Sequence, residues 1–401
     1  MEERPKKQHA LKFDILRYLY YRGPMAINEL SKLTGKSLPL ITTHIHSLKE
    51  QGLIINNQYA QSTGGRRAHE YQLNKESGRY IIAVSVDQLV TRIAAFNLHN
   101  EQVDEPKEKA INLEKAEESL SDLVNFIKGY IKELPLSISD MLGIGIAMPG
   151  FVNAEKGINN THFGLGERSL ADYIAKEVGC EVFIDNDSSA IALAELNFGA
   201  ARGMQDVMVV NVGWGIGLGM IVNGKLFRGH SGFAGEFSHI PLADSNNLCV
   251  CGKRGCLEVD ASLLVLTKRA QKEMKNGYAS KMEGMFSSNG ASNLDIVLNA
   301  ANAGDQLAVN LLSKAGFLIG KGIATLIHIM NPQGVVVSGR GAIASRILMA
   351  PIQQAVNEFS IPMLAEQCTI LPSPLNKEAE LLGAATLVME RTDKFFNEVL
   401  I

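Results

Sequence analysis

Three of the chain's five cysteines lie within eight residues, at positions 249, 251 and 256, and two glycines stand between them. Thiolates at this spacing can point at one centre, and the imidazole of His239 lies close enough in the sequence to supply a fourth ligand. The set Cys249, Cys251, Cys256 and His239 therefore predicts a tetrahedral Zn²⁺ site without an open position, which would be structural. The alternative is a buried thiol cluster or a redox pair.

The cysteine segment is the last part of an ordered series of motifs. The series comprises Ile-Asp-Asn-Asp-Ser at 184–188, Gly-x-Gly-x-Gly at 213–217, Asn-Gly-Lys-Leu at 223–226, Gly-Glu-x-x-His at 235–239 and Cys-x-Cys-Gly-x-x-Gly-Cys-x-Glu at 249–258. In this order the motifs resemble the ROK family of sugar kinases and sugar-responsive repressors. The resemblance covers roughly residues 80–390 and continues downstream through Asn-Pro at 331–332.

The elements that must position these motifs alternate between strands and helices from Tyr80 onward, which is typical of an α/β protein. The resemblance implies an actin-like, hexokinase-like body of two lobes with a ligand in the cleft between them. We expect a first lobe over residues 80–188, completed by a C-terminal helix at 385–401. The second lobe would span residues 189–384 and carry the zinc-binding loop.

The resemblance also implies roles for five polar side chains. Those that occupy the sugar-contacting positions of the kinases are Asn186, Asp187, Glu236, His239 and Glu258. The kinase residue that matches Asp187 takes the proton from the attacking hydroxyl. Asp187 could instead cap a helix that begins at residue 188. His239 could serve both centres, with one ring nitrogen on the metal and the other facing the ligand.

The phosphate-binding part of the kinase pattern is degraded. The kinases carry Asp-x-Gly-Gly-Thr-Lys after the first strand, whereas residues 87–92 read Asp-Gln-Leu-Val-Thr-Arg. Leu89 and Val90 replace both glycines and would block the approach of backbone N–H groups to a phosphate. Trp214 replaces a threonine in the second, glycine-rich loop, where its indole would crowd the nucleotide. We therefore expect no kinase activity, with Asp187 left as a vestigial base.

Residues 1–74 predict a winged helix-turn-helix DNA-binding domain. Apolar residues at helical spacing indicate helices at 10–22 and 26–33 and a third from Ser37 to about residue 51, whose buried face would include Leu40. Short strands at 53–55 and 69–73 would frame a wing. The third helix of such a domain enters the major groove of double-stranded DNA.

The side chains expected to face DNA are polar or basic. On the third helix and its approach they are Lys36, Ser37, Thr42, Thr43, His44, His46 and Lys49, and in the wing they are Arg66 and Arg67. Residues 1–75 contain 12 Lys and Arg against 6 Asp and Glu, whereas the rest of the chain contains 27 against 36. A basic head on an acidic body is expected where the head meets an acidic polymer.

Composition favours a cytoplasmic protein. Hydrophobic residues make up 46% of the chain and charged residues 20%, as in ordinary globular proteins. No apolar run suggests a membrane span, and the amino terminus lacks the apolar core of a signal peptide. An odd number of cysteines with a tight cluster fits a reducing compartment better than it fits disulfides.

The combined pattern predicts a transcriptional repressor of carbohydrate-utilisation genes. A sugar or sugar phosphate in the cleft would act as inducer, and a homodimer or dimer of dimers would present two heads to a palindromic operator. Two alternatives stay open at this point. The chain could be an ATP-dependent sugar kinase with a regulatory head, or a repressor controlled by a protein partner.

Overall fold

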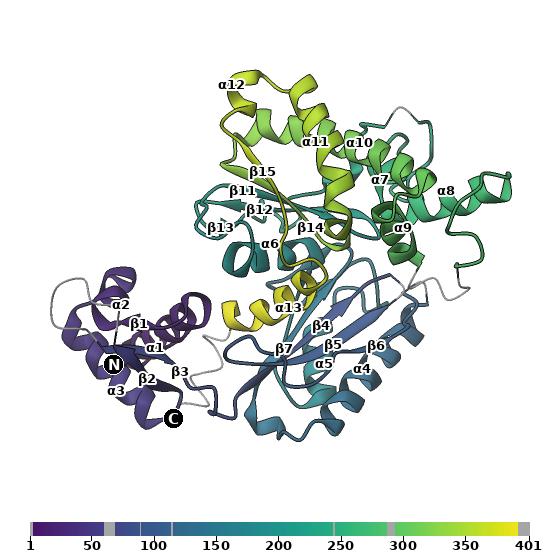
Figure 1. Ribbon diagram of the computed structural model, residues 1–401. Helices are drawn as coiled ribbons and strands as arrows, with labels where there is room; N and C mark the ends of the chain where they lie inside the picture. The colour runs from purple at the N-terminus through teal and green to yellow at the C-terminus, as the bar shows by residue number, and fades with distance from the viewer. Residues whose placement is uncertain are drawn as a thin grey trace.

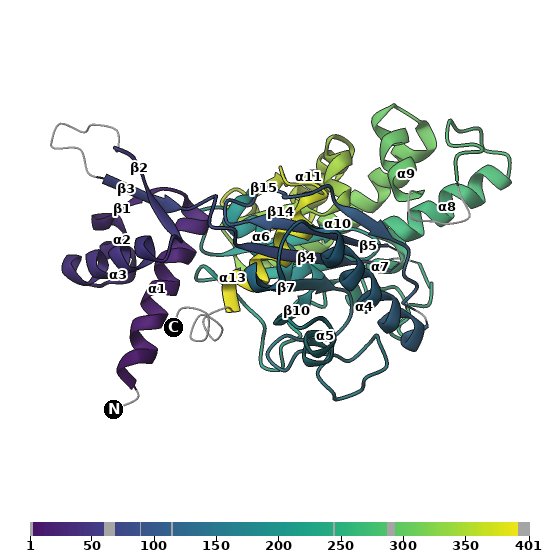
Figure 2. The same ribbon diagram turned by 90° about the horizontal axis from the view of Figure 1, so that it is seen from below.

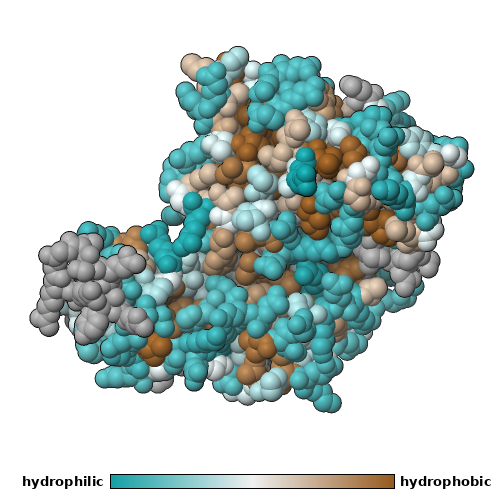
Figure 3. All heavy atoms as spheres, in the orientation of Figure 1, coloured by the Kyte–Doolittle hydropathy of each residue, from teal (hydrophilic) through white to brown (hydrophobic). Residues whose placement is uncertain are grey.

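The computed structural model describes residues 3–59, 69–88, 90–113, 115–243, 245–286 and 293–391. Figure 1 shows a small head formed by the N-terminal part of the chain beside a body of two lobes, with the C-terminal helix between the lobes. The view in Figure 2 shows the head projecting from one end of the body. The outline in Figure 3 is indented between the head and the second lobe.

The head contains three helices and a three-stranded antiparallel sheet. These elements are α1 (Glu3–Arg22), α2 (Ile27–Thr34), α3 (Leu38–Glu50), β1 (Met25–Ala26), β2 (Ile54–Tyr59) and β3 (His69–Leu73), with strand order β1-β3-β2. Ile15, Leu30 and Ile45 are fully buried where the helices meet. Glycines in the left-handed conformation end α2 at Gly35 and follow α3 at Gly52. The predicted three helices and wing strands are confirmed.

The first lobe is built on a sheet of order β10-β7-β4-β5-β6. Its elements are β4 (Tyr80–Val86), β5 (Thr91–Asn97), β6 (Lys107–Lys109), α4 (Ala116–Glu133), β7 (Met141–Met148), α5 (Leu170–Val178) and β10 (Val182–Asn186). Side chains alternate between the two faces of β4. Ile82 and Val84 pack with α4 and α5, whereas Ile81 and Ala83 face the opposite side.

The second lobe is built on a sheet of order β13-β12-β11-β14-β15. Its strands are β11 (Val207–Val212), β12 (Ile216–Val222), β13 (Lys225–Leu226), β14 (Gly334–Ser338) and β15 (Thr369–Pro372). One face packs against α6 (Asp187–Phe198). The main helices on the other side are α8 (Leu263–Lys275), α9 (Asn293–Asn302), α10 (Gln306–Met330) and α11 (Ser345–Phe359).

Shorter elements complete the connections between these layers. They are η1 (Ile138–Asp140), β8 (Val152–Asn153), β9 (Ile158–Asn159), η2 (Phe237–His239), α7 (Glu258–Ala261), η3 (Arg340–Ala344) and α12 (Pro362–Ala365). Two of them, η2 and α7, carry candidate ligand residues at their ends.

Helix α10 passes the length and composition test for a membrane span. The sequence suggested no such segment, and the helix meets the criterion because its apolar side chains run along 25 residues. More than half of the apolar window is buried in the protein, at 56%, and Ile319 and Ile323 lie in the core of the second lobe. The packing of α10 against α11 accounts for its apolar character.

The helix α13 (Glu378–Arg391) returns from the second lobe and packs against the first sheet and α6. Residues 385–391 of the expected closing helix lie in α13, which begins at Glu378, and residues 392–401 lie outside the described part. Small residues allow its close approach. A Cβ on Gly145 of β7 would lie 1.8 Å from the carbonyl oxygen of Ala384, and one on Gly383 would lie 2.6 Å from that of Ala190 in α6.

We expect Gly145→Ala to destabilise the protein by about 3 kcal/mol, because the added methyl group meets α13 backbone that cannot rotate away. Gly129→Ala is the matched control, since Gly129 lies in α4 with open space around its Cβ position and alanine favours a helix. Thermal unfolding of both variants measures the difference. Equal melting temperatures would contradict the packing described for α13.

Candidate ligand site and metal centre

The four predicted metal ligands converge in space. The nitrogen and sulfur ligand atoms of His239, Cys249, Cys251 and Cys256 all lie within 4.8 Å of one another. The Nδ1 of His239 is 3.5 Å from the Sγ of Cys249, and the Sγ atoms of Cys251 and Cys256 are 3.6 Å apart. Zn–S and Zn–N bonds of about 2.3 and 2.1 Å place ligand atoms about 3.5–3.8 Å apart at the corners of a tetrahedron. The residues therefore fit a tetrahedral metal ion.

The loop that carries the cysteines projects from the body. Val250 is 95% exposed and Leu248 is 63% exposed, so the middle of the loop is not held by a hydrophobic core. Gly252 and Gly255 adopt positive φ angles, which lets the chain turn twice between the cysteines. Burial raises the pKa of the Cys249 thiol. A bound cation would supply the charge that holds it as a thiolate.

His239 lies between the metal cluster and the carboxylates. Its Nδ1 faces Cys249, and its Nε2 is 3.7 Å from a carboxylate oxygen of Glu236. The two ring nitrogens thus point to different groups, which is the arrangement that a shared role requires.

Glu236 and Glu258 lie close enough to interact electrostatically. Burial is the main factor that raises the pKa of Glu236, and the neighbouring Glu258 raises it further. Burial also raises the pKa of Glu258, whereas His239 and a hydrogen bond from Ser238 lower it. Among these interactions, His239 is the one cationic partner of Glu236 and Glu258. The two carboxylates are therefore available to accept hydrogen bonds from the hydroxyl groups of a ligand.

Asn186 and Asp187 stand at the start of α6, and Asn186 rather than Asp187 is the cap. The side-chain oxygen of Asn186 accepts hydrogen bonds from the backbone N–H groups of Ser188 and Ser189, and Asp187 is the first helical residue. Burial raises the pKa of Asp187 to about 6, and the carboxylates of Glu380 and Glu236 act in the same direction. The alternative role proposed for Asp187, that of helix cap, is therefore filled by Asn186, one residue earlier.

Two glycines of β12, Gly217 and Gly219, serve helix packing. A Cβ on Gly217 would lie 1.9 Å from the Oγ of Ser188, and one on Gly219 would lie 2.5 Å from the Ser188 carbonyl oxygen. These two glycines are required because α6 crosses β12 at close range. Trp214 is 5% exposed and belongs to the core of the second lobe. The indole that was expected to crowd a nucleotide packs within this core.

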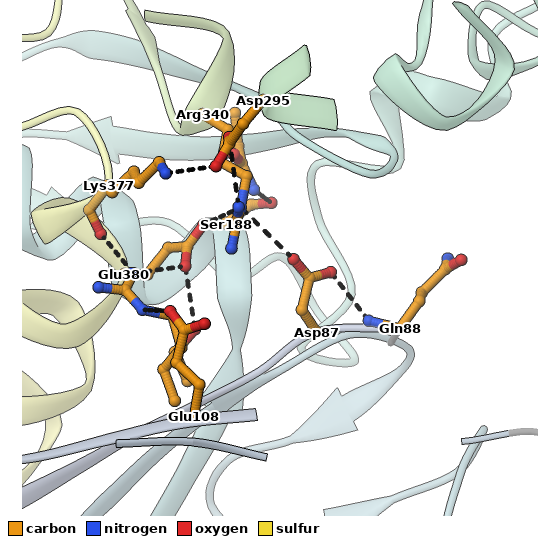
Figure 4. A network of polar contacts seen from close by, with 11 residues as sticks. Asp87, Gln88, Glu108, Ser188, Asp295, Arg340, Lys377 and Glu380 are labelled. Atoms are coloured by element: carbon orange, nitrogen blue, oxygen red, sulfur yellow. Dashed lines mark hydrogen bonds and ion pairs between the residues drawn. The ribbon is translucent and has the colours of Figure 1, made fainter. Parts of the chain in front are cut away.

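Around Arg340, ion pairs join the two lobes (Figure 4). Arg340 of η3 lies 4.0 Å from Asp87, 3.9 Å from Glu380 and 3.6 Å from Asp295. Lys377 approaches Asp295 to 2.5 Å. Asp87 follows β4 in the first lobe, whereas Arg340 and Asp295 belong to the second, so the guanidinium connects both lobes.

The network continues along the first sheet through Arg92. Its guanidinium lies 3.4 Å from Glu380 and 3.3 Å from Glu108. Burial and the neighbouring Glu380 raise the pKa of Asp87 well above its usual range, and Arg340 opposes this shift. Asp87 and Arg92 begin and end the segment that the sequence resemblance sets against the first phosphate loop of the kinases. The pairing residues of the second lobe and of α13 were not found from the sequence.

A second buried charge was also missed. Asp185 has no exposed surface and pairs with Arg228, at 2.5 Å, and with Arg391, at 3.0 Å. The partners lie 43 and 206 positions away in the chain, and no spacing in the sequence connects them. These pairs fix the end of β10, from which Asn186 and Asp187 follow.

In the head, the third helix presents fewer polar side chains than expected. His44 is 6% exposed, because its position on α3 turns inward beside Ile41 and Ile45, so its assignment as a DNA-facing residue is wrong. Leu40, expected in the buried face, is 38% exposed. The remaining predicted contacts on this helix and its approach are exposed or partly exposed, namely Lys36, Ser37, Thr42, Thr43, His46 and Lys49. Arg66 and Arg67 lie outside the described residues.

The sequence pattern of the ROK family matches residues 83–391, which span both lobes and all the cleft residues described above. The chain belongs to the ROK family. A winged helix-turn-helix DNA-binding pattern matches residues 9–55. These matches confirm the predicted fold class, which is an α/β, actin-like two-lobed ROK body preceded by a winged helix-turn-helix domain.

Relatives of this ROK protein include repressors that match more than nine-tenths of its length. It is 28% identical to the xylose repressor of Bacillus spizizenii over 386 residues, which cover 94% of each chain. The N-acetylglucosamine repressor of Escherichia coli O157:H7 is 28% identical over 384 residues, covering 93% of this chain and 91% of that protein. A solved ROK family transcriptional regulator, a homolog of the E. coli MLC protein, matches 98% of this chain with a TM-score of 0.77 at 25% identity and is itself covered to 99%.

ROK kinases match the body alone. The ROK glucokinase of Streptomyces griseus, solved with glucose and AMPPNP, has a TM-score of 0.66 at 25% identity. It covers 77% of this chain, and the match spans 98% of the kinase. The same body thus occurs both in enzymes and in DNA-binding regulators, and the family alone does not assign the activity.

We expect Asp187→Asn to stabilise the free protein at pH 8. Because the folded-state pKa of about 6 lies above the ordinary value of 3.8, Asp187 contributes stability below pH 3.8 that is lost as pH rises through 6. Replacing the carboxylate by an uncharged amide restores this stability. Since the group retains some contact with solvent, the gain is on the order of 1 kcal/mol.

Thermal unfolding at pH 8 and pH 5 checks this expectation. The difference between Asp187→Asn and the unaltered protein should be larger at pH 8. Glu105→Gln, which neutralises an exposed carboxyl of the first lobe, serves as the control and should show no such pH dependence. A less stable Asp187→Asn protein at pH 8 would contradict the electrostatic description of the site.

Proposed function

We propose that this protein is a transcriptional repressor of carbohydrate-utilisation genes whose affinity for DNA is controlled by a sugar or sugar phosphate in the interlobe cleft. The observation that carries the proposal is the pairing of a winged head with a ROK body in one chain, over a length shared with relatives that are named repressors. The kinases in the comparison cover the body without the head.

The ligand would bind at the end of the cleft that holds Asn186, Asp187, Glu236, His239 and Glu258. The pKa of each of the three carboxyl groups is raised by burial. A buried carboxylate is stabilised when it accepts hydrogen bonds from neutral hydroxyl groups, because these bonds replace the lost hydration and add no charge. A polyhydroxylated ligand is therefore the chemical class that suits this group of side chains.

The charges at the other end of the cleft argue against a sugar kinase. Asp87 and Arg92 of the degraded phosphate loop interact with Arg340 and Glu380, so their charges are engaged within the protein. A nucleotide would bring several negative charges beside Asp87, Glu380 and Asp295. The kinase alternative requires these ion pairs to separate, and we infer that the protein is not an enzyme.

Control by ligand requires a difference in affinity between two arrangements of the protein. A sugar that bridges Asn186, at the end of β10 in the first lobe, and the η2–α7 segment of the second lobe would favour one interlobe angle. If that angle gives the two heads of a homodimer, or of a dimer of dimers, a spacing unsuited to the operator, DNA is released. Such a regulator acts in the cytoplasm, where its operator lies, without membrane insertion.

The metal centre would be a structural zinc site in this account. Cys249, Cys251, Cys256 and His239 would hold the ion, which would fix the exposed loop and orient the imidazole of His239 toward Glu236. Ligand binding and metal binding would then be linked through His239. The metal would have no part in a reaction.

To test the function, genomic DNA fragments are first selected by binding to the purified protein, and an operator is derived from them. We expect one compound from a panel of D-xylose, D-glucose, N-acetylglucosamine and their phosphates to weaken operator binding by roughly tenfold or more. Fluorescence anisotropy measures the release and calorimetry measures direct binding. ATP should bind poorly and leave the DNA complex unchanged.

Other results would select the alternatives. Magnesium-dependent ADP formation with a hexose would establish a kinase. If no sugar of the panel binds or releases the operator, and a protein from the sugar-transport machinery does release it, control by a protein partner would be established. Absence of any enriched DNA fragment would overturn the assignment as a DNA-binding regulator.

We expect Cys251→Ser to remove the metal and to lower the melting temperature of the body by several degrees, because one of four ligands is lost. Mass spectrometry of metals should find about one zinc ion per unaltered chain and much less in the variant. Cys180→Ser changes a free cysteine outside the cluster and should keep the zinc. An unaltered protein free of zinc would contradict the metal assignment.

A further inference from the structure

The candidate ligand site and the DNA-binding head are joined by two helices, each of which reaches both. Helix α6 begins at Asp187 in the cleft and ends at Phe198 beside the head. Helix α13 carries Glu380 in the interlobe ion network and Glu390 beside the head. At a rise of about 1.5 Å per residue, each helix spans roughly 15 Å between its two contacts.

The two helices form one rigid unit. A Cβ on Gly383 of α13 would lie 2.6 Å from the backbone of Ala190 in α6, so the two backbones are in direct contact. On its other side α13 touches the first sheet at Gly145 more closely still, since a Cβ there would lie 1.8 Å from the Ala384 carbonyl oxygen. Contacts between backbones cannot be adjusted by changing side-chain rotamers, and a displacement at one end of the pair is carried to the other.

The head meets this unit through a few side chains of α1. The rings of Tyr20 and Tyr21 lie 5.9 and 5.7 Å from the ring of Phe198 at the end of α6. The hydroxyl of Tyr21 donates a hydrogen bond of 2.8 Å to Glu390 of α13, and Arg17 lies 3.9 Å from the same carboxylate. Figure 2 shows α1 of the head facing the end of α13.

Buried side chains of α1, α6 and α13 form one hydrophobic cluster at this junction. An open pocket of about 400 Å³ lies beside it, lined from the head by Tyr21 and Arg22 and from the body by Leu196, Asn197 and Arg202. The ring contacts of Tyr20 and Tyr21 therefore hold α1 on one side, while the other side borders open space. Within the head, α1 packs on α3 through buried residues such as Ile15 and Ile45, so α3 would follow α1.

We propose that Tyr21, Phe198 and Glu390 are positioning residues that couple the ligand site to the orientation of the DNA-binding head through the paired helices α6 and α13. The inference rests on the proposed function and adds the route of its regulation. A ligand that contacts Asn186 and Asp187 acts on the first turn of α6. The displacement reaches Phe198 and Glu390, which hold α1 and with it the recognition helix.

The test compares the effect of a sugar on operator affinity in three variants. Tyr21→Phe removes the hydroxyl that bonds Glu390, and Phe198→Ala removes the ring contacts. Tyr18→Phe is the matched control on the same helix, because its hydroxyl bonds Leu33 within the head. The sugar used is the one that releases DNA from the unaltered protein in the panel of D-xylose, D-glucose, N-acetylglucosamine and their phosphates.

We expect Tyr21→Phe and Phe198→Ala to bind the sugar normally, while the fold-change in operator affinity that the sugar causes falls by about threefold or more. Tyr18→Phe should keep the full response. An unchanged response in both junction variants overturns the proposal. In that case the unaltered protein would still respond to sugar, so the proposed function would survive.

A second measurement does not depend on a sugar or on DNA. Asp187→Asn alters the cleft end of α6, and hydrogen exchange then reports on the amides of α1. When Asp187→Asn is introduced into the otherwise unaltered chain, we expect the exchange rates of the α1 amides to change by about threefold or more. When it is introduced into the Tyr21→Phe variant, we expect these rates to stay nearly constant. Equal changes in both backgrounds overturn the coupling, even if no sugar in the panel binds.

Discussion

The contact between the backbones of α6 and α13 is the constraint on which the molecule depends. Gly383 and Ala190 bring the two helices together without intervening side chains, and Gly145 does the same for α13 and the first sheet. Because α6 also packs on the second sheet, one helix pair serves as a layer shared by both lobes. The cleft, its ligand residues and the attachment of the head all take their positions from this layer.

The electrostatic character of the cleft differs between its two ends. At one end, Asp187, Glu236 and Glu258 are carboxyl groups with pKa values raised by burial and with little compensating positive charge. At the other end, guanidinium groups lie among the carboxyl groups across the lobes, and Arg340 opposes the rise that burial and Glu380 cause in the pKa of Asp87. The first arrangement leaves hydrogen-bonding capacity for an external molecule, whereas the second uses it within the protein.

Much of the fold and part of the candidate site could be predicted from the sequence, because the signals were local or lay in motifs. The cysteine spacing predicted the cluster that three cysteines form with His239, and helical periodicity identified the three helices of the head. His44 was misjudged because the rotation of α3 about its axis depends on packing against other helices. The pairs of Arg340 and Arg391 could not be predicted, since their partners are brought near only by the tertiary fold.

The glycines that face α6 have a consequence for how uncharacterised sequences are classified. Gly217 is the last glycine of the Gly-x-Gly-x-Gly motif and Gly219 follows it in β12, and a helix leaves no room for a side chain at either position. Selection for packing would preserve such glycines in proteins that never meet a nucleotide. In proteins of this fold, residues that contact a phosphate indicate whether the protein is catalytic. Glycines that lie against α6 indicate only that the protein shares the ancestry of the fold.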